Sequence, residues 1–168
     1  MLPKRAAGAE IGTWRGDKAA ALLRRADPAV LYLIDPWAHQ VECERTMYGG
    51  RGDGQAELDA IYASVVDRFA GDERVIIKRQ TSAQAAQGFT PGCLTWAYLD
   101  GNRRYESVRE NLDLYSRVVH PGGYLAGDDY GLSGASGDGV RRPVEEFVAA
   151  GRAADFLVRG NEFLIRLP

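Results

Sequence analysis

Two short apolar segments near the end of the chain place the strongest constraint on its fold. Residues 156–158 and 163–167 both have the pattern of β-strands, and only residues 159–161, Arg-Gly-Asn, separate them. Parallel strands need a crossover of about a dozen residues, whereas a connection this short can only form a hairpin. The last strand must therefore run antiparallel to the strand before it.

Five earlier apolar segments alternate with helical patterns along the rest of the chain. The predicted strands cover residues 9–13, 30–34, 75–77, 94–99 and 124–126. The predicted helices cover residues 19–26, 58–69, 81–87, 108–119 and 144–148. This order predicts an α/β fold in one domain over residues 1–168: a Rossmann-like, doubly wound, mostly parallel seven-stranded sheet with an antiparallel C-terminal strand. A dinucleotide-binding dehydrogenase sheet would be parallel throughout.

Charge and composition limit the class of partner. The 168 residues contain 21 Lys and Arg against 23 Asp and Glu, so no excess of basic charge favours nucleic acid or an anionic membrane. No apolar run approaches the roughly 20 residues that a membrane span needs, and we expect a cytoplasmic protein. The 2 cysteines are too few for a disulfide framework. We therefore expect a small-molecule partner.

The expected sheet selects candidate site residues before any motif is considered. In open parallel sheets, ligands bind beyond the carboxyl ends of the strands, where the strand order reverses. The acids that follow the predicted strands, and so point toward this rim, are Glu10, Asp35, Asp100, Asp128 and Asp129. S-Adenosylmethionine carries a sulfonium and an ammonium but no phosphate, so an acidic rim favours it over a pyrophosphate cofactor.

The glycines after the first strand and the acid after the second strand indicate a nucleoside site. Gly12 and Gly16 would let the backbone approach a ligand closely. Asp35 ends the second strand about 20 residues further on, where a carboxylate can accept both ribose hydroxyls. Two alternatives remain open here: an ordinary strand-to-helix turn at the glycines, and a capping or solvated loop acid at Asp35.

Four sequence motifs follow the predicted strands in order. They are EIGTWRG at residues 10–16, LIDPW at 33–37, LDGN at 99–102 and GGYLAGDDY at 122–130. Together they resemble the class I S-adenosylmethionine-dependent methyltransferases. The resemblance covers residues 9–147 and is closest to small-molecule O-methyltransferases, the branch with the enzymes of the cephamycin hydroxylation complex and of macrolide sugars.

The resemblance implies which residues meet the cofactor. The implied S-adenosylmethionine site consists of Glu10, Gly12, Thr13, Gly16, Asp35, Trp37, Thr81, Ser82 and Asp100. Within it, Glu10 and Gly12 would line the methionine part, and Asp35 would hold the ribose. Trp37 would pack on the ribose or adenine, and Thr81 and Ser82 would lie by the adenine.

The same resemblance implies a divalent cation held by Asp100, Asp128 and Asp129. Magnesium suits such hard oxygen ligands, and it could orient a substrate diol and lower the pKa of the attacking hydroxyl. A simpler alternative is that Asp128 and Asp129 are turn acids that cap the segment after the fifth strand.

The catalytic candidates are Asp100, Asp129 and His39. The family commonly has a histidine where Arg103 stands, and an arginine cannot deprotonate a substrate. Arg103 could instead pair with a substrate carboxylate or phosphate, or lie on the surface. His120 precedes the fifth strand, at the wrong edge of the sheet. His39 lies in the long polar segment 38–56, which we expect to be a functional or mobile loop.

The main function predicted from the sequence is methyl transfer from S-adenosylmethionine to a hydroxyl of a small molecule, with magnesium assistance. The alternatives are an S-adenosylmethionine-binding module without catalysis and an NAD(P)-dependent reductase. The acidic rim and the C-terminal hairpin disfavour the reductase. Because little of the chain precedes the first strand, we expect the long loop, or a second subunit of a homo-oligomer, to cover the site.

Overall fold

The hairpin predicted near the end of the chain is present and sets one edge of the sheet. The structure is a computed structural model that describes residues 1–39, 54–131 and 138–168. Strands β6 (Asp155–Arg159) and β7 (Glu162–Arg166) pair antiparallel across a tight turn in which Gly160 has a φ of 62°. Strand β7 also pairs antiparallel with β5 (Val119–Gly127). The reversed strand is therefore inserted between β5 and β6.

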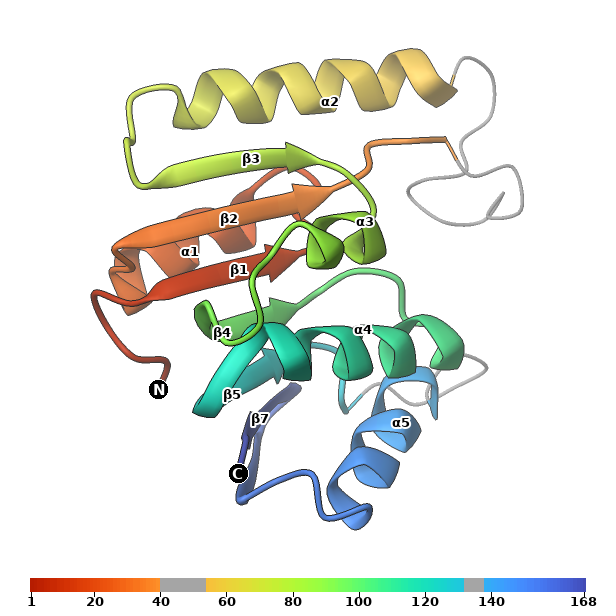
Figure 1. The fold of residues 1–168 in the computed structure, drawn as a ribbon. Helices are drawn as coiled ribbons and strands as arrows, with labels where there is room; N and C mark the ends of the chain where they lie inside the picture. Colours follow the sequence, from red (N-terminus) through yellow and green to blue (C-terminus); the bar gives the residue numbers. More distant parts are fainter. Residues whose placement is uncertain (40–53, 132–137) are drawn as a thin grey trace.

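The other strands run parallel and reverse their order at β1. They are β1 (Ala7–Ile11), β2 (Val30–Asp35), β3 (Val75–Arg79) and β4 (Leu94–Leu99), followed by β5. The described residues form a seven-stranded sheet in the order β3-β2-β1-β4-β5-β7-β6 (Figure 1). The predicted fold class is confirmed. The strand order reverses between β1 and β4, so their carboxyl ends mark the expected ligand site.

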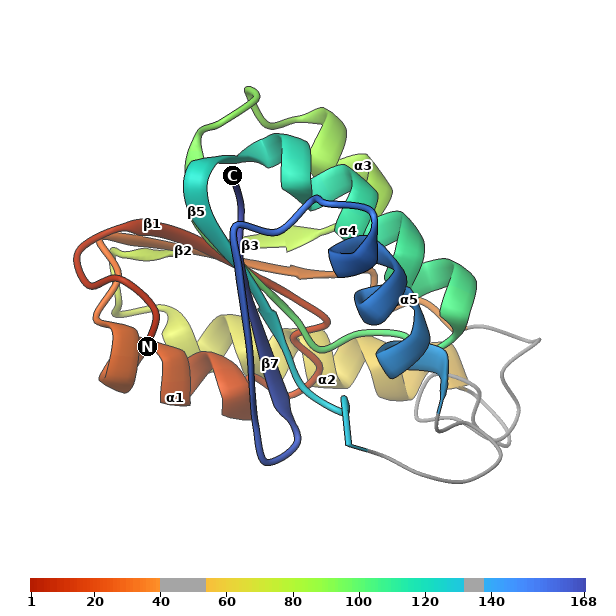
Figure 2. The ribbon, with the colours of Figure 1, turned by 90° about the horizontal axis from the view of Figure 1, so that it is seen from below.

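Helices cover both faces of the sheet (Figure 2). One face carries α1 (Asp17–Ala26) and α2 (Gly54–Phe69), and the other carries α3 (Ser82–Gln87), α4 (Tyr105–Val118) and α5 (Asp138–Ala149). Each face has its own apolar core, as expected of a doubly wound sheet. Within the described ranges, no helix is long and apolar enough to span a membrane.

Several element boundaries differ from the prediction, among them the start of α5 at Asp138 rather than at residue 144 and the starts of α2 and β5. Helix α2 begins at Gly54, before the predicted residue 58. The prediction placed the start too late because the first turn of the helix lacks the apolar stripe that marks the rest. Strand β5 begins at Val119 rather than at residue 124, because it continues through the Pro-Gly-Gly segment, where Gly122 has a φ of 77° and the register against β4 is irregular. Most of the predicted loop 38–56 falls on residues 40–53, outside the described residues.

Trp96 anchors the core between the sheet and α1. Its side chain has no exposed surface, and a Cβ at Gly8 of the neighbouring strand would lie 2.2 Å from Cζ2 of the indole. The register pairs these two residues directly, so the indole lies over the glycine. Gly8 is therefore the residue that lets β1 and β4 pair beneath this ring.

We predict that Gly8→Ala lowers the free energy of unfolding by about 1–3 kcal/mol, because the added methyl group overpacks the site. Urea denaturation measures this change. Gly71→Ala is the matched control, since no atom lies within 4 Å of the position that its methyl group would take, and it should change stability by less than about 1 kcal/mol. Adding Trp96→Phe should restore part of the loss. Equal stability of Gly8→Ala and the wild type would contradict this packing.

Candidate functional site

The loop after β1 is fixed between its two neighbouring strands. The Gly12 N–H donates to the Ile34 carbonyl at 2.8 Å, and the Asp100 N–H donates to the Ile11 carbonyl at 2.8 Å. Gly12 has a φ of 93°, and a Cβ there would lie 2.4 Å from Cα of Gly101. Only glycine permits this conformation and this close approach. The loops after β1 and β4 therefore meet at the point where the strand order reverses.

Asp35 links the loop after β1 to the loop after β2. Its carboxylate is 1% exposed and accepts the backbone N–H of Trp14 at 3.0 Å and of Trp37 at 2.8 Å. The indole Nε1 of Trp37 donates to the Trp14 carbonyl at 2.9 Å. Both tryptophans have positive φ, 51° and 40°, a conformation that bulky residues rarely adopt without such support. Asp35 thus holds two strained loops, and its ribose contact stays a prediction.

Trp37 is part of the core in this structure. Its side chain has no exposed surface, and its ring lies 5.1 Å from that of Tyr62 on α2. The indole therefore packs between the sheet and α2. In this conformation it offers no free face to a nucleoside.

Glu10 is a buried acid without a hydrogen-bond partner. Its side chain has no exposed surface, and within the described part of the chain neither carboxylate oxygen has a partner, nor does the Thr13 hydroxyl. Burial raises the pKa of Glu10 well above its ordinary value. The negative charges of Asp100 and Asp35 raise this pKa further. The nearby Thr13 hydroxyl, which forms no well-aligned hydrogen bond with the carboxylate, and the positive charge of Lys18 both lower it. Such a carboxylate is suited to receive a cationic or hydrogen-bond-donating ligand.

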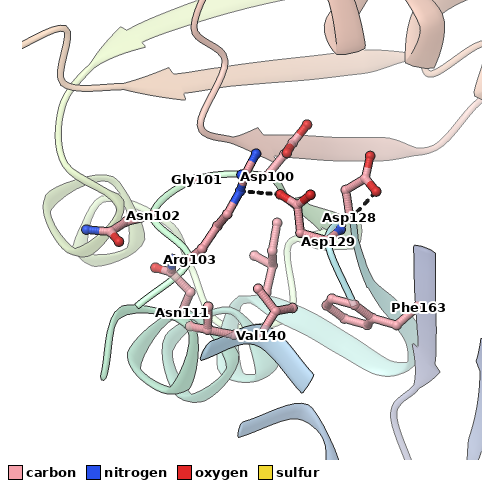
Figure 3. Close-up of a pocket in the computed structure, with 11 residues that line it drawn as sticks. Asp100, Gly101, Asn102, Arg103, Asn111, Asp128, Asp129, Val140 and Phe163 are labelled. Carbon is pink, nitrogen blue, oxygen red and sulfur yellow. Dashed lines mark hydrogen bonds and ion pairs between the residues drawn. The ribbon is translucent and has the colours of Figure 1, made fainter. Parts of the chain in front are cut away.

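Asp100 lies at the end of β4 and lines a pocket (Figure 3). Burial raises its pKa to about 6; Lys18 and Arg103 oppose this effect, and Asp128 and Asp129 add to it. The pocket wall combines polar and apolar side chains, among them Arg103, Asn111, Asp129, Val140 and Phe163. The parallel pairing of β1 with β2 and with β4 brings the acids after these strands to one rim, where Asp35 and Asp100 raise the pKa of Glu10.

Asp128 and Asp129 follow β5, and each is paired with a cation. Lys18 of α1 lies 2.9 Å from Oδ2 of Asp128, and Arg103 forms an ion pair with Asp129. The Asn161 amide, in the hairpin turn, donates to Asp128 at 3.0 Å and to Asp129 at 3.3 Å. Burial raises the pKa of Asp128, but Lys18 and the Asp129 N–H hold it below its ordinary value.

The magnesium site predicted at Asp100, Asp128 and Asp129 is not supported by this arrangement. Among residues 1–39, 54–131 and 138–168, no group of three or more His, Cys, Asp or Glu side chains is arranged to hold a metal ion. The physical reason is that Lys18 and Arg103 already form ion pairs with Asp128 and Asp129, two of the three acids that a divalent cation would need. These residues do not fit a divalent cation, and no step below uses one.

Three further predicted residues lie apart from this pocket. Thr81 caps α3 through a capping box with Gln84, and the Ser82 carbonyl accepts the Tyr115 hydroxyl at 3.1 Å. The adenine contacts of Thr81 and Ser82 stay predictions. The His39 N–H donates to Gln55 of α2 at 2.9 Å, and His39 is not among the residues that line the pocket.

Sequence reasoning missed Lys18 and Asn161. Lys18 lies in the first turn of α1, where the helix dipole disfavours a cation, so its position indicates a carboxylate partner elsewhere. That signal could have identified it. Asn161 looks like an ordinary hairpin-turn residue, and only the pairing of β5 with β7 brings it to the acids.

Comparisons with known proteins agree with this fold and motif order. The family model described as "Methyltransferase domain" matches residues 9–130. The search of curated proteins found no match. Among solved structures, the chain is similar to the O-methyltransferase NovP, with 19% identity, a TM-score of 0.62, and coverage of 96% of this chain and 72% of NovP.

Two other solved structures show the same likeness. A Streptococcus mutans protein in complex with SAH has 12% identity and a TM-score of 0.65, over 99% of this chain and 91% of that one. An O-methyltransferase family protein from Burkholderia thailandensis has 14% identity and a TM-score of 0.59, over 95% and 49%. At such identities these structures support the fold, while the family match covers most of the chain. The chain belongs to the methyltransferase domain family, and its resemblance to the class I methyltransferases is confirmed.

Proposed function

We propose that this chain transfers the methyl group of S-adenosylmethionine to a hydroxyl oxygen of a small-molecule acceptor. The observation that carries the proposal is the buried carboxylate of Glu10, which has no hydrogen-bond partner among the described residues and lies next to the glycine loop of a methyltransferase domain. When bound, S-adenosylmethionine supplies a methyl group that its sulfonium makes electrophilic. The chain itself must hold that cation, position the acceptor and remove a proton.

The rim suits a cationic nucleoside. Neither oxygen of Glu10 accepts a hydrogen bond from the residues that the structure describes, and Asp35 and Asp100 add negative charge around it. An ammonium group beside Glu10 would relieve the cost of its burial, since opposite charge favours the ionised form. The pyrophosphate of NAD(P) would meet the same acids with repulsion, which disfavours the reductase alternative.

Asp100 is the best placed group to accept the acceptor's proton. It lines the pocket, and Lys18 and Arg103 form their ion pairs with the neighbouring Asp128 and Asp129. A pKa of about 6 keeps it ionised at neutral pH while making it a stronger base than an ordinary aspartate. As the oxygen–methyl bond forms, the hydroxyl proton passes to Asp100 and the electron pair of the broken bond stays on sulfur.

Calorimetric titration with S-adenosylmethionine, S-adenosylhomocysteine, NAD and NADP tests the cofactor. We expect the first two to bind and the nicotinamide cofactors not to bind. Labelled S-adenosylmethionine, offered with a panel of phenols, catechols and sugars, then tests transfer to oxygen. Binding without transfer to any member would favour the non-catalytic module, and binding of NAD alone would overturn the proposal.

Glu10→Gln should stabilise the fold and weaken the cofactor site. Because the pKa of Glu10 is raised in the folded chain, its ionised form costs stability at neutral pH, and the cost disappears in acid where the group is protonated. The melting temperature of the variant should therefore exceed that of the wild type at pH 7, with a gap that closes as the pH falls.

The same variant should bind S-adenosylmethionine at least about tenfold more weakly, because a hydrogen bond to a charged group contributes roughly 1.5–3 kcal/mol. Differential scanning fluorimetry and calorimetry measure the two effects. Glu73→Gln, at an exposed turn residue, is the control and should change neither. Unaltered affinity in Glu10→Gln would argue against this methionine contact.

The rate of methyl transfer should fall as the pH drops below about 6, because a protonated Asp100 cannot accept the hydroxyl proton. Asp100→Asn should lower the rate about 100-fold or more and abolish this pH dependence. A pH–rate profile with the acceptor found in the panel measures both effects. Asp67→Asn, at an exposed position on α2, serves as the control. A wild-type profile that is flat between pH 5 and pH 7, roughly the range around this pKa, would exclude Asp100 as the base.

A further inference from the structure

Lys18 ties together four elements at the acidic rim. It lies in α1, and its Nζ donates to the Tyr98 hydroxyl of β4 at 2.9 Å and to Oδ2 of Asp128 at 2.9 Å. It also donates to Oε1 of Glu162 in β7 at 3.3 Å. An ammonium has only three protons to donate, so this one is saturated by protein oxygens. Burial lowers its pKa, but Asp128, Asp100 and Glu162 together more than offset this effect, so the pKa is raised and the side chain remains cationic.

Lys18 and Arg103 balance the charge of the three aspartates as a divalent cation would. Asp100, Asp128 and Asp129 carry three negative charges when ionised. Lys18 is paired with Asp128, and Arg103 is paired with Asp129. Two monovalent cations leave the cluster with the same net charge of minus one that one divalent cation would leave. The cluster is therefore compensated by side chains of the chain itself.

A divalent cation would have to compete with this ammonium. The Nζ atom is 2.9 Å from Oδ2 of Asp128, so a cation bound about 2.1 Å from that oxygen would lie within about 5 Å of Nζ. Even with the dielectric constant of bulk water, repulsion between the two cations at that distance weakens binding by about tenfold. The ammonium of Lys18 is hydrogen-bonded to three oxygens from separate parts of the fold. A metal ion that displaced the ammonium would therefore break all three hydrogen bonds.

We propose that Lys18 and Arg103 take the place of the divalent cation at this rim, so that the chain binds no metal there. The Nζ atom of Lys18 also lies over the Tyr98 ring, 4.8 Å from its centroid, which fixes the ammonium between Asp128 and β4. Lys18 is then a positioning residue that holds Asp128. The Asn161 amide links Asp128 to Asp129, so Lys18 also acts indirectly on the turn that carries Asp129. The claim about metal binding does not depend on the proposed methyl transfer, because it is tested on the metal alone.

Titration with MnCl₂ and MgCl₂, followed by calorimetry and by thermal unfolding, tests this proposal. The wild type should show no saturable binding and no shift in melting temperature. Lys18→Met keeps the stem but removes the charge, and it should bind Mn²⁺ at least about tenfold more tightly than the wild type. Adding Asp128→Asn should abolish that gain. The double variant Lys18→Met with Arg103→Met should bind more tightly still.

Lys4→Met, at an exposed lysine outside the cluster, is the matched control and should behave as the wild type. Saturable Mn²⁺ or Mg²⁺ binding by the wild type that Asp128→Asn removes would overturn the proposal, whether or not the variants fold. A folded Lys18→Met that gains no metal binding would also overturn it. If the double variant binds no more tightly than Lys18→Met, the role assigned to Arg103 is wrong. Should methyl transfer never be observed, these outcomes remain decisive for the metal site.

Discussion

The chemistry of this molecule depends on two backbone hydrogen bonds that extend the sheet beyond its strands. Through them the Gly12 N–H is bound to Ile34, and the Asp100 N–H is bound to Ile11. They fix the loop after β1 between the loops after β2 and β4, at the point where the strand order reverses. Because the backbone is fixed there, the acids at these strand ends cannot spread apart. Their convergence is a consequence of the topology.

Such convergence of acids carries an energetic cost that the fold only partly offsets. Burial and like charge raise the pKa values of Glu10 and Asp100, so both are less stable as anions than they would be in water. Asp128 and Asp129 are offset by cations, and Asp35 is offset by two backbone donors. The uncompensated acids are therefore those nearest the glycine loop. Functional sites commonly retain such unfavourable charge for the sake of a ligand.

The sequence predicted the parts of the structure that depend on local pattern. The short connection before residue 162 required a reversed strand, and apolar periodicity located the five βα units. The acids at the rim followed from where each strand ends. Partnerships across the fold could not be predicted in this way, because Lys18 and Asn161 come from elements far apart in the chain. Likewise, only the folded structure shows that Asp35 holds two strained loops.

The acids after β4 and β5 show why a sequence motif predicts a fold more reliably than it predicts a ligand. All three aspartates that the resemblance associates with a metal lie where the motifs place them, Asp100 directly after β4 and Asp128 and Asp129 directly after β5. Their chemistry is decided by neighbours outside the motif. A lysine in the first turn of α1 and an arginine after β4 supply the positive charge that a metal would bring. Because a carboxylate binds whichever cation is nearest and best held, identical acids can belong to a metal site in one chain and to an ion-pair network in another.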